Sequence, residues 1–261
     1  MQIRLNPVTL ITGAGSGIGA GCARDLARKS TGGLLLADID EAALSLVADE
    51  LDVAGVSPER VSTLAFDVSD IERWGQAAAF IQAQYGRLDW ALVNTSAAHG
   101  QAVAESDLVD WGRTTSAQLE ATIQSLRTIM PLMAKNNQGG AIVVATSAAA
   151  IKAEPLAQNS APGLLQVMRA ASREAAHSNV RINAIAPGGP TTPMWNEMPW
   201  FHDLVGDSGN ENAALEKISH LTRPLARYAQ GNDVNRLILA LLAEEAPITG
   251  ATLVVDGGGS L

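Results

Sequence analysis

Cysteine, aromatic residues and excess positive charge are all scarce in this 261-residue chain, and each shortage excludes something. The one cysteine, Cys22, cannot form a disulfide within the chain, and we expect a buried thiol because it falls inside a predicted helix. Aromatic residues make up 4% of the chain, so aliphatic and alanine side chains must form most of the core. The formal net charge of −9 argues against a nucleic-acid partner and against an anionic lipid surface, because both attract basic faces.

Long apolar runs are also missing. No stretch reaches the roughly 18 apolar residues that a membrane-spanning helix needs. Residues 1–7 lack the basic and apolar pattern of a secretory signal. The sequence therefore predicts a cytoplasmic protein with no membrane partner.

Short aliphatic runs alternate with segments of helical period along most of the chain. Continuous apolar strands are typical of a sheet covered by helices on both faces, and their alternation with helices predicts parallel strands. We expect one domain over residues 1–261, with a doubly wound Rossmann fold and a seven-stranded, mostly parallel sheet. The expected strands are residues 8–12, 34–38, 61–66, 90–94, 141–146, 181–186 and 252–255. The clearest helical segments are residues 19–29, 71–85 and 163–177.

One region, residues 188–222, breaks this rhythm. It is rich in proline and glycine and also carries large apolar side chains: Met194, Trp195, Met198, Trp200 and Phe201. We expect an irregular insertion that serves as a substrate loop or lid over the site. The alternative is a surface excursion that packs on a neighbouring subunit.

A glycine-rich segment follows the first expected strand and opens the first expected helix. Glycines there let the backbone turn sharply and approach a pyrophosphate, whose oxygens the free N–H groups of the helix then meet. The pattern is short, but its strand–helix context is the one that dinucleotide binding needs. We expect cofactor contacts from Gly13, Ser16, Gly17, Ile18 and Gly19.

The second expected strand ends in Asp38, about twenty residues after these glycines, as in dinucleotide folds. A carboxylate there can accept hydrogen bonds from the ribose hydroxyls and repels a 2′-phosphate. Residues 39–41, which begin with Ile39, contain no arginine that would pair with such a phosphate. The sequence therefore predicts NAD(H) as the cofactor. Asp67 and Val68 are expected beside the adenine, and Asn94 beside the nicotinamide ribose.

Taken together, these motifs resemble those of the short-chain dehydrogenase/reductase family, and the resemblance covers essentially the whole length of the chain. The resemblance lies in the glycine segment, in Asp67-Val68, in the segment from Gly86 to Asn94, and in three later segments at residues 180–188, 224–234 and 249–258. It implies further cofactor contacts from Pro187, Gly188 and Thr192. It also implies a homotetramer or homodimer built on the helices that contain residues 111–130 and 163–177.

The resemblance implies a catalytic set of Asn, Ser, Tyr and Lys, of which this chain matches only the serine. Ser147 stands at the serine position, where it would polarise a carbonyl, and Gln118 replaces the asparagine. The tyrosine and lysine positions fall on Ala157 and Ala161, or on Ser160 and Leu164 if the gap is placed later. The chain has two tyrosines, Tyr85 and Tyr228, and we expect neither to reach the nicotinamide.

Other residues could replace the missing acid/base pair. Lys152 and Glu154 lie on the loop after Ser147, and His99 has the most suitable ordinary pKa. Asn159 and Ser160 could donate hydrogen bonds but are poor bases at neutral pH. For Lys152, Glu154 and His99 the alternative is a solvated loop residue, and Ser147 could be retained for local packing alone. No metal site is expected.

Two functions remain. The first is an NAD(H)-dependent oxidoreductase that transfers hydride on a hydrophobic alcohol or carbonyl compound with a non-standard active site. The second is a catalytically degenerate NAD-binding or regulatory protein, or the same scaffold used for a non-redox reaction. We prefer the oxidoreductase with an apolar small-molecule substrate.

Overall fold

A computed structural model describes residues 6–95, 108–135, 139–148, 151, 160–188, 199–243 and 247–261, with the side chains of 108–115, 160–162 and 199 left aside. In it, one sheet has the strand order β3-β2-β1-β4-β5-β6-β7, and all neighbouring strands are parallel. The predicted fold class is confirmed. The strands are β1 (Thr9–Thr12), β2 (Leu34–Asp38), β3 (Val61–Ala65), β4 (Trp90–Val93), β5 (Gly140–Ala145), β6 (Val180–Pro187) and β7 (Thr252–Val255).

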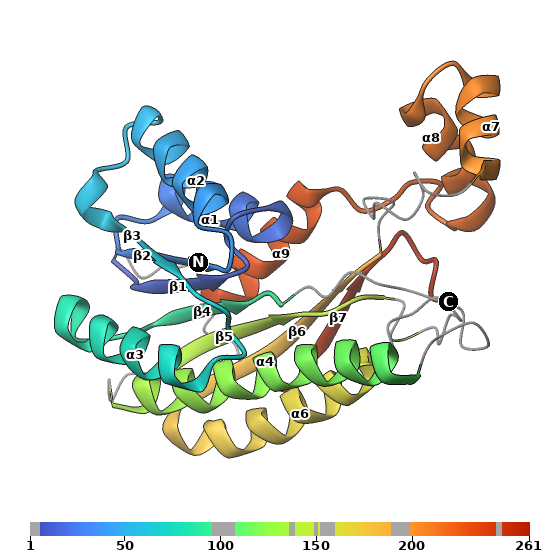
Figure 1. The fold of residues 1–261 in the computed structure, drawn as a ribbon. Helices are drawn as coiled ribbons and strands as arrows, with labels where there is room; N and C mark the ends of the chain where they lie inside the picture. Colours follow the sequence, from blue (N-terminus) through green and yellow to red (C-terminus); the bar gives the residue numbers. More distant parts are fainter. Residues whose placement is uncertain are drawn as a thin grey trace.

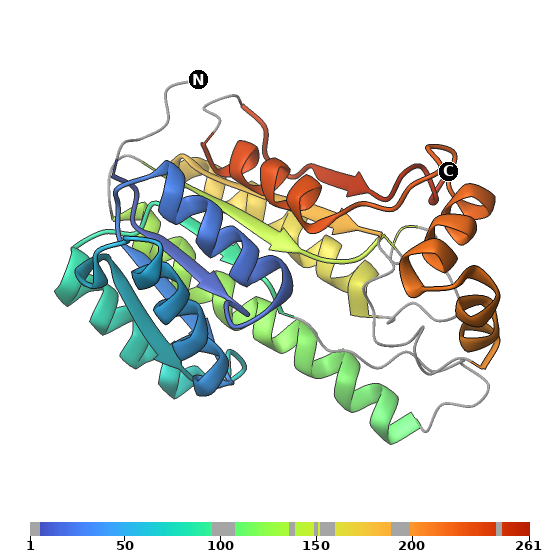
Figure 2. The same cartoon turned by 90° about the horizontal axis from the view of Figure 1, so that it is seen from above.

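Helices cover both faces of the sheet (Figure 1). Helices α1 (Gly17–Lys29), α2 (Glu41–Val53) and α9 (Gly231–Ala243) lie on one face, and α3 (Ile71–Tyr85), α4 (Leu108–Ala134) and α6 (Ser160–Ala175) lie on the other. Helices α7 (Pro199–Ser208) and α8 (Glu211–Thr222) stand beyond the end of the sheet, on the side of the C-terminus (Figure 2). Within the described residues, short 3-10 helices span Pro58–Arg60 and Ala176–Ser178.

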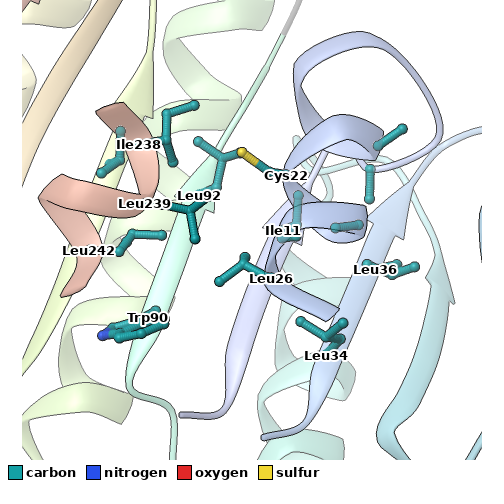
Figure 3. Close-up of a cluster of buried hydrophobic side chains, with 14 of the residues drawn as sticks. Ile11, Cys22, Leu26, Leu34, Leu36, Trp90, Leu92, Ile238, Leu239 and Leu242 are labelled. Carbon is teal, nitrogen blue, oxygen red and sulfur yellow. The ribbon is translucent and has the colours of Figure 1, made fainter. Parts of the chain in front are cut away.

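The core has two halves, one on each face of the sheet. Leu34 and Leu36 of β2 belong to the half under α1, α2 and α9, whereas Leu35 belongs to the half under α3, α4 and α6. All three leucines are fully buried, because the side chains of a strand alternate between two covered faces. Figure 3 shows the first half, in which Cys22 and Leu26 of α1 point into the apolar cluster.

The strand order reverses between β1 and β4. The chain moves outward from β1 through β2 to β3, then crosses back to β4 and continues to β7. In open α/β sheets, ligands bind outside the carboxyl ends of the strands at this switch point. The fold therefore places the site where β1 and β4 end.

The region expected to be irregular contains two helices, which corrects that part of the sequence analysis. Helix α7 begins at Pro199, a residue well suited to a first helical turn, and Asn210 caps α8 by accepting a hydrogen bond from the Ala213 N–H at 2.9 Å. Phe201, Ala214 and Ile218 form a small apolar cluster with Tyr228. Phe201 is thus part of local packing. Within the described part of the chain, no helix has the length and apolar character needed to cross a bilayer.

The turn after α8 holds Ala226 in a left-handed conformation, with φ 53°. The left-handed backbone conformation favours glycine, because a residue with a Cβ costs about 1–3 kcal/mol in it. We expect Ala226→Gly to raise the free energy of unfolding in urea by about 1 kcal/mol. Ala79→Gly, on the exposed side of α3, is the matched control and should lower it by about 1 kcal/mol. Equal losses in both variants would contradict the strain at Ala226.

Candidate active site

The glycine segment forms a tight backbone turn between β1 and α1. Gly13 has φ 62°, and a Cβ on it would overlap the carbonyl oxygen of Asn94. A Cβ on Gly19 would overlap the carbonyl oxygen of Gly13. Both overlaps are with backbone, so these two positions require glycine if the turn is to keep its shape.

The N-terminus of α1 has no side-chain cap. The hydroxyl of Ser16, the N-cap residue, makes no hydrogen bond to the first turn, and that turn carries no acidic residue. In α2 and α3, by contrast, Asp40 and Asp70 accept hydrogen bonds from the first turn. A Cβ on Gly17 would meet nothing within 4 Å. The first N–H groups of α1 are therefore open to an anion, and the helix dipole favours one there.

Asp38 lies beside this turn and is oriented by backbone donors. Its Oδ2 accepts a hydrogen bond from the Gly15 N–H at 2.9 Å, and its Oδ1 accepts one from the Asp40 N–H at 3.1 Å. A Cβ on Gly15 would lie 3.1 Å from Oδ2. The side chain of Ile39, next in sequence, is 71% exposed. A fixed carboxylate with an exposed apolar neighbour suits a ribose with an adenine beside it.

Residues after β3 and β4 complete this side of the site. Asp67 is exposed at the end of β3, where its Oδ1 accepts hydrogen bonds from Ser69, and the Val68 carbonyl accepts one from Trp74. Asn94 follows β4 and contacts the glycine turn itself: its Nδ2 donates to the Gly13 carbonyl at 3.3 Å. The Asn94 N–H also donates to Thr12 Oγ1 at 2.9 Å, which ties β1 to β4 at the switch point.

Three other predicted residues lie at the ends of β5 and β6. Ser147 is exposed two residues beyond β5, while Pro187 ends β6 and Gly188 donates its N–H to the Val255 carbonyl at 2.9 Å. Because carboxyl ends of parallel strands share one edge, these residues lie at the same edge of the sheet as the glycine turn.

Gln118 is nearly buried on α4, at 9% exposure. Its Nε2 donates to the Thr95 carbonyl at 3.1 Å, so the side chain is anchored to the residue that directly follows Asn94. Several predicted residues lie outside the described residues: His99, Lys152, Glu154, Ala157, Asn159 and Thr192. Ser160 and Ala161 are in the first turn of α6, with only their backbone described, and Leu164 is buried in the core.

Both tyrosines have their own packing. Tyr85 closes α3, and its hydroxyl is 3.0 Å from Ser62 Oγ on the edge strand β3. Tyr228 is 8% exposed and carries the guanidinium of Arg223 over its ring, 5.0 Å from the centroid.

The cysteine is buried and unreactive: Cys22 Sγ donates to Asn235 Oδ1 at 3.5 Å, and burial raises the pKa of the thiol to about 12. The thiol therefore stays protonated at neutral pH.

Sequence reasoning missed Asp256, which follows β7. It is 5% exposed, its Oδ1 accepts a hydrogen bond from the Gly258 N–H at 2.9 Å, and its Oδ2 has no partner among the described residues. A Cβ on Gly188 would lie 2.5 Å from the Asp256 Cβ. The sequence shows an Asp-Gly-Gly turn inside the segment of family resemblance at residues 249–258, and nothing there indicates a role for the Asp256 side chain. Among the residues that the structure describes, no group of three or more His, Cys, Asp or Glu could hold a metal ion.

Comparison with known proteins decides the family. The family model described as enoyl-(acyl carrier protein) reductase matches residues 13–260. A short-chain dehydrogenase/reductase of Botryotinia fuckeliana is 30% identical over 264 residues, covering 97% of this chain and 96% of that protein. The chain belongs to the short-chain dehydrogenase/reductase family. The family resemblance seen in the sequence is thereby confirmed, and with it an oxidoreductase that uses a nicotinamide cofactor.

Two solved structures share the whole fold. Carveol dehydrogenase from Mycobacterium avium, in complex with NAD, superposes with a TM-score of 0.86 at 24% identity, covering 99% of each chain. L-Sorbose reductase from Gluconobacter frateurii, complexed with NADPH and L-sorbose, superposes with a TM-score of 0.85, also at 24% identity, covering 100% of this chain and 99% of that one. At this identity the likeness shows the fold, and the two structures differ in cofactor.

Proposed function

We propose that this member of the family is an NAD(H)-dependent oxidoreductase that acts on hydrophobic alcohols or carbonyl compounds through a non-standard active site. The observation that carries the proposal is the Asp38 carboxylate, held by the Gly15 and Asp40 N–H groups at the mouth of the glycine turn. When bound, NAD accepts hydride from an alcohol carbon, and NADH returns it to a carbonyl carbon.

The described residues fit such a cofactor. The uncapped N-terminus of α1 would hold the pyrophosphate through Gly17, Ile18 and Gly19, and the turn at Gly13 gives it room. Asp38 would accept hydrogen bonds from the adenine ribose, with Ile39, Asp67 and Val68 around the adenine. Asn94, Pro187 and Gly188 would hold the nicotinamide half, together with Thr192 from outside the described residues, as the family resemblance implies.

Asp38 supports NAD over NADP. Its carboxylate already has two backbone donors, which fix its orientation toward the turn. A 2′-phosphate would bring negative charge against this group, whereas ribose hydroxyls would donate to it. The next residue along the chain is the apolar Ile39, so no cation stands there to offset the repulsion.

The substrate side would work without the usual tyrosine and lysine. Both tyrosines of the chain are engaged elsewhere, Tyr85 with Ser62 and Tyr228 with Arg223. Ser147 would donate its hydroxyl hydrogen to the substrate oxygen, and Gln118 would help to shape the loop after Asn94. His99 or Lys152 would then move the proton. The segment 188–222 would cover an apolar substrate, in one cytoplasmic domain that assembles as a homodimer or homotetramer.

A dehydrogenase assay with Ser147 variants tests this proposal. We expect NAD reduction with at least one hydrophobic secondary alcohol among cyclohexanol, 1-phenylethanol and carveol. Ser147→Ala should lower kcat about 10²–10³-fold, the usual effect of removing one donor to the reacting oxygen, and Ser147→Thr should retain most activity. Ser62→Ala, a serine on the distant strand β3, is the matched control and should change kcat less than about twofold. Equal activity in Ser147→Ala and wild type would remove the serine from the mechanism.

The alternative of a non-catalytic NAD-binding protein, to which the engagement of both tyrosines points, is not favoured by the comparisons. The same assay separates the two. Tight NADH binding without turnover of any alcohol or carbonyl compound would establish this second function.

If catalysis depends on His99, the pH–rate profile should show an apparent pKa near that of histidine, about 6.5, and His99→Ala should abolish turnover.

A further inference from the structure

The end of the chain packs tightly against the turn that joins α8 to α9. Gly257 and Gly258 both have left-handed backbones, with φ 67° and 87°. A Cβ on Gly257 would overlap the carbonyl oxygen of Arg227, and a Cβ on Gly258 would lie 3.0–3.2 Å from the ring of Pro224. The Leu225 N–H donates to the Gly257 carbonyl at 3.0 Å. The glycines thus allow a contact between two backbones that any side chain would prevent.

Arg223 lies at the centre of this contact. On one side its guanidinium covers the ring of Tyr228, at 5.0 Å from the centroid. On the other side its Nη1 occupies the place that a Cβ on Gly259 would take. Its Nε is buried without a hydrogen-bond partner among the described residues. The guanidinium is therefore held by an aromatic face and a glycine backbone, an arrangement that depends on its flat shape.

Each side of Arg223 leads to a different part of the site. Tyr228 packs with Phe201 of α7 and with Ala214 and Ile218 of α8. The glycine tail begins at Asp256, whose Cβ lies against Gly188 at the end of β6. A Cβ on Gly188 would in turn lie 3.0 Å from the Cβ of Ala148, the residue after Ser147. A continuous series of contacts therefore runs from α7 and α8 through Arg223 to the loops that follow β5 and β6.

We propose that Arg223 is a positioning residue that fixes α7 and α8 at the carboxyl end of the sheet and thereby sets the affinity for the substrate. The part of this inference that concerns the substrate rests on the proposed function. The part that concerns the helices does not, since it follows from the packing alone. Arg223 lies outside the glycine turn and Asp38, so the cofactor should bind equally well without it.

Hydrogen–deuterium exchange of the full-length protein tests the packing directly. In Arg223→Ala, amides of residues 200–222 should exchange about tenfold faster than in wild type, as expected for the loss of a partly buried cation–π contact, while amides of β1 and α1 should be unchanged. Gly259→Ala should give the same result from the opposite side, because its Cβ would displace the guanidinium. Arg223→Lys keeps a cation over the ring, so its exchange rates should fall between those of wild type and those of Arg223→Ala.

Arg227→Ala is the matched control on the same turn, because the Arg227 side chain pairs with Asp233 and not with the tail. It should leave exchange in α7 and α8 unchanged. Unchanged exchange in Arg223→Ala, or equally faster exchange across the whole sheet, would overturn the proposal.

Steady-state kinetics with the most active alcohol of the panel tests the substrate part. Arg223→Ala should raise KM about tenfold, with kcat and the Kd for NADH within about twofold of wild type. A tenfold fall in kcat with an unchanged KM would overturn a role in substrate affinity. If the wild type turns over no alcohol, the proposed function fails and the assignment to substrate affinity fails with it, and the exchange experiment still decides whether Arg223 holds the helices.

Discussion

Asp38→Ala is expected to weaken NADH binding about 10- to 100-fold and to strengthen NADPH binding. The carboxylate would accept charge-assisted hydrogen bonds from the ribose, each of which contributes about 1.5–3 kcal/mol. Without it the 2′-phosphate of NADPH meets no fixed negative charge beside Gly15. The ratio of the two Kd values, measured by calorimetric titration, should therefore move toward NADPH by about 100-fold or more.

Asp40→Asn is the control for this change. Asp40 is the next carboxylate along the chain, and its side chain caps α2 by accepting a hydrogen bond from the Ala43 N–H at 3.0 Å. Asparagine caps helices about as well as aspartate, so both Kd values should stay within about twofold of wild type. An equal effect of the two variants would show that general surface charge, and not Asp38, selects the cofactor.

Gly19→Ala is expected to abolish NADH binding at millimolar concentrations. The new Cβ would overlap the Gly13 carbonyl, and neither backbone segment can yield without opening the turn between β1 and α1. Overpacking of this kind costs about 1–3 kcal/mol of stability. Displacement of the α1 N-terminus would also remove charge-assisted hydrogen bonds to the pyrophosphate, and the loss of two of them weakens binding about 100-fold or more.

Gly75→Ala makes the same substitution where it should help. A Cβ on Gly75, in the middle of α3, would meet nothing within 4 Å. Alanine is the better helix former by about 0.8–1.0 kcal/mol, so this variant should be more stable in urea and bind NADH normally. Normal NADH binding by Gly19→Ala would contradict the close packing of the turn.

The glycine turn and the Asp38 carboxylate beside it were predictable because their signals are local. A glycine-rich turn between a strand and a helix, and a carboxylate at the end of the next strand, are read within about thirty consecutive residues. The strands were predictable for the same reason, since runs such as Leu34-Leu35-Leu36 are apolar on both faces. The predicted cofactor contacts of single residues, including Asn94 beside the nicotinamide ribose, remain predictions.

What the sequence could not predict depends on contacts between distant segments. The prolines and glycines of residues 188–222 suggested an irregular loop, yet α7 and α8 form there because Phe201, Ala214 and Ile218 bury one another. Asp256 lies in a segment of family resemblance that indicates no role for its side chain, and Arg223 shows no motif; their surroundings come from Gly188 and Gly259. Which residues stand at the tyrosine and lysine positions of the family depends on where the gap in the alignment is placed. The loss of this pair therefore stays a proposal.

Titration of the wild-type protein with NADH and with NADPH tests the central claim most directly. We predict that NADH binds at least about tenfold more tightly, because Asp38 accepts from its ribose and repels the 2′-phosphate of NADPH. Equal or tighter binding of NADPH, or the binding of neither nucleotide, would contradict the account.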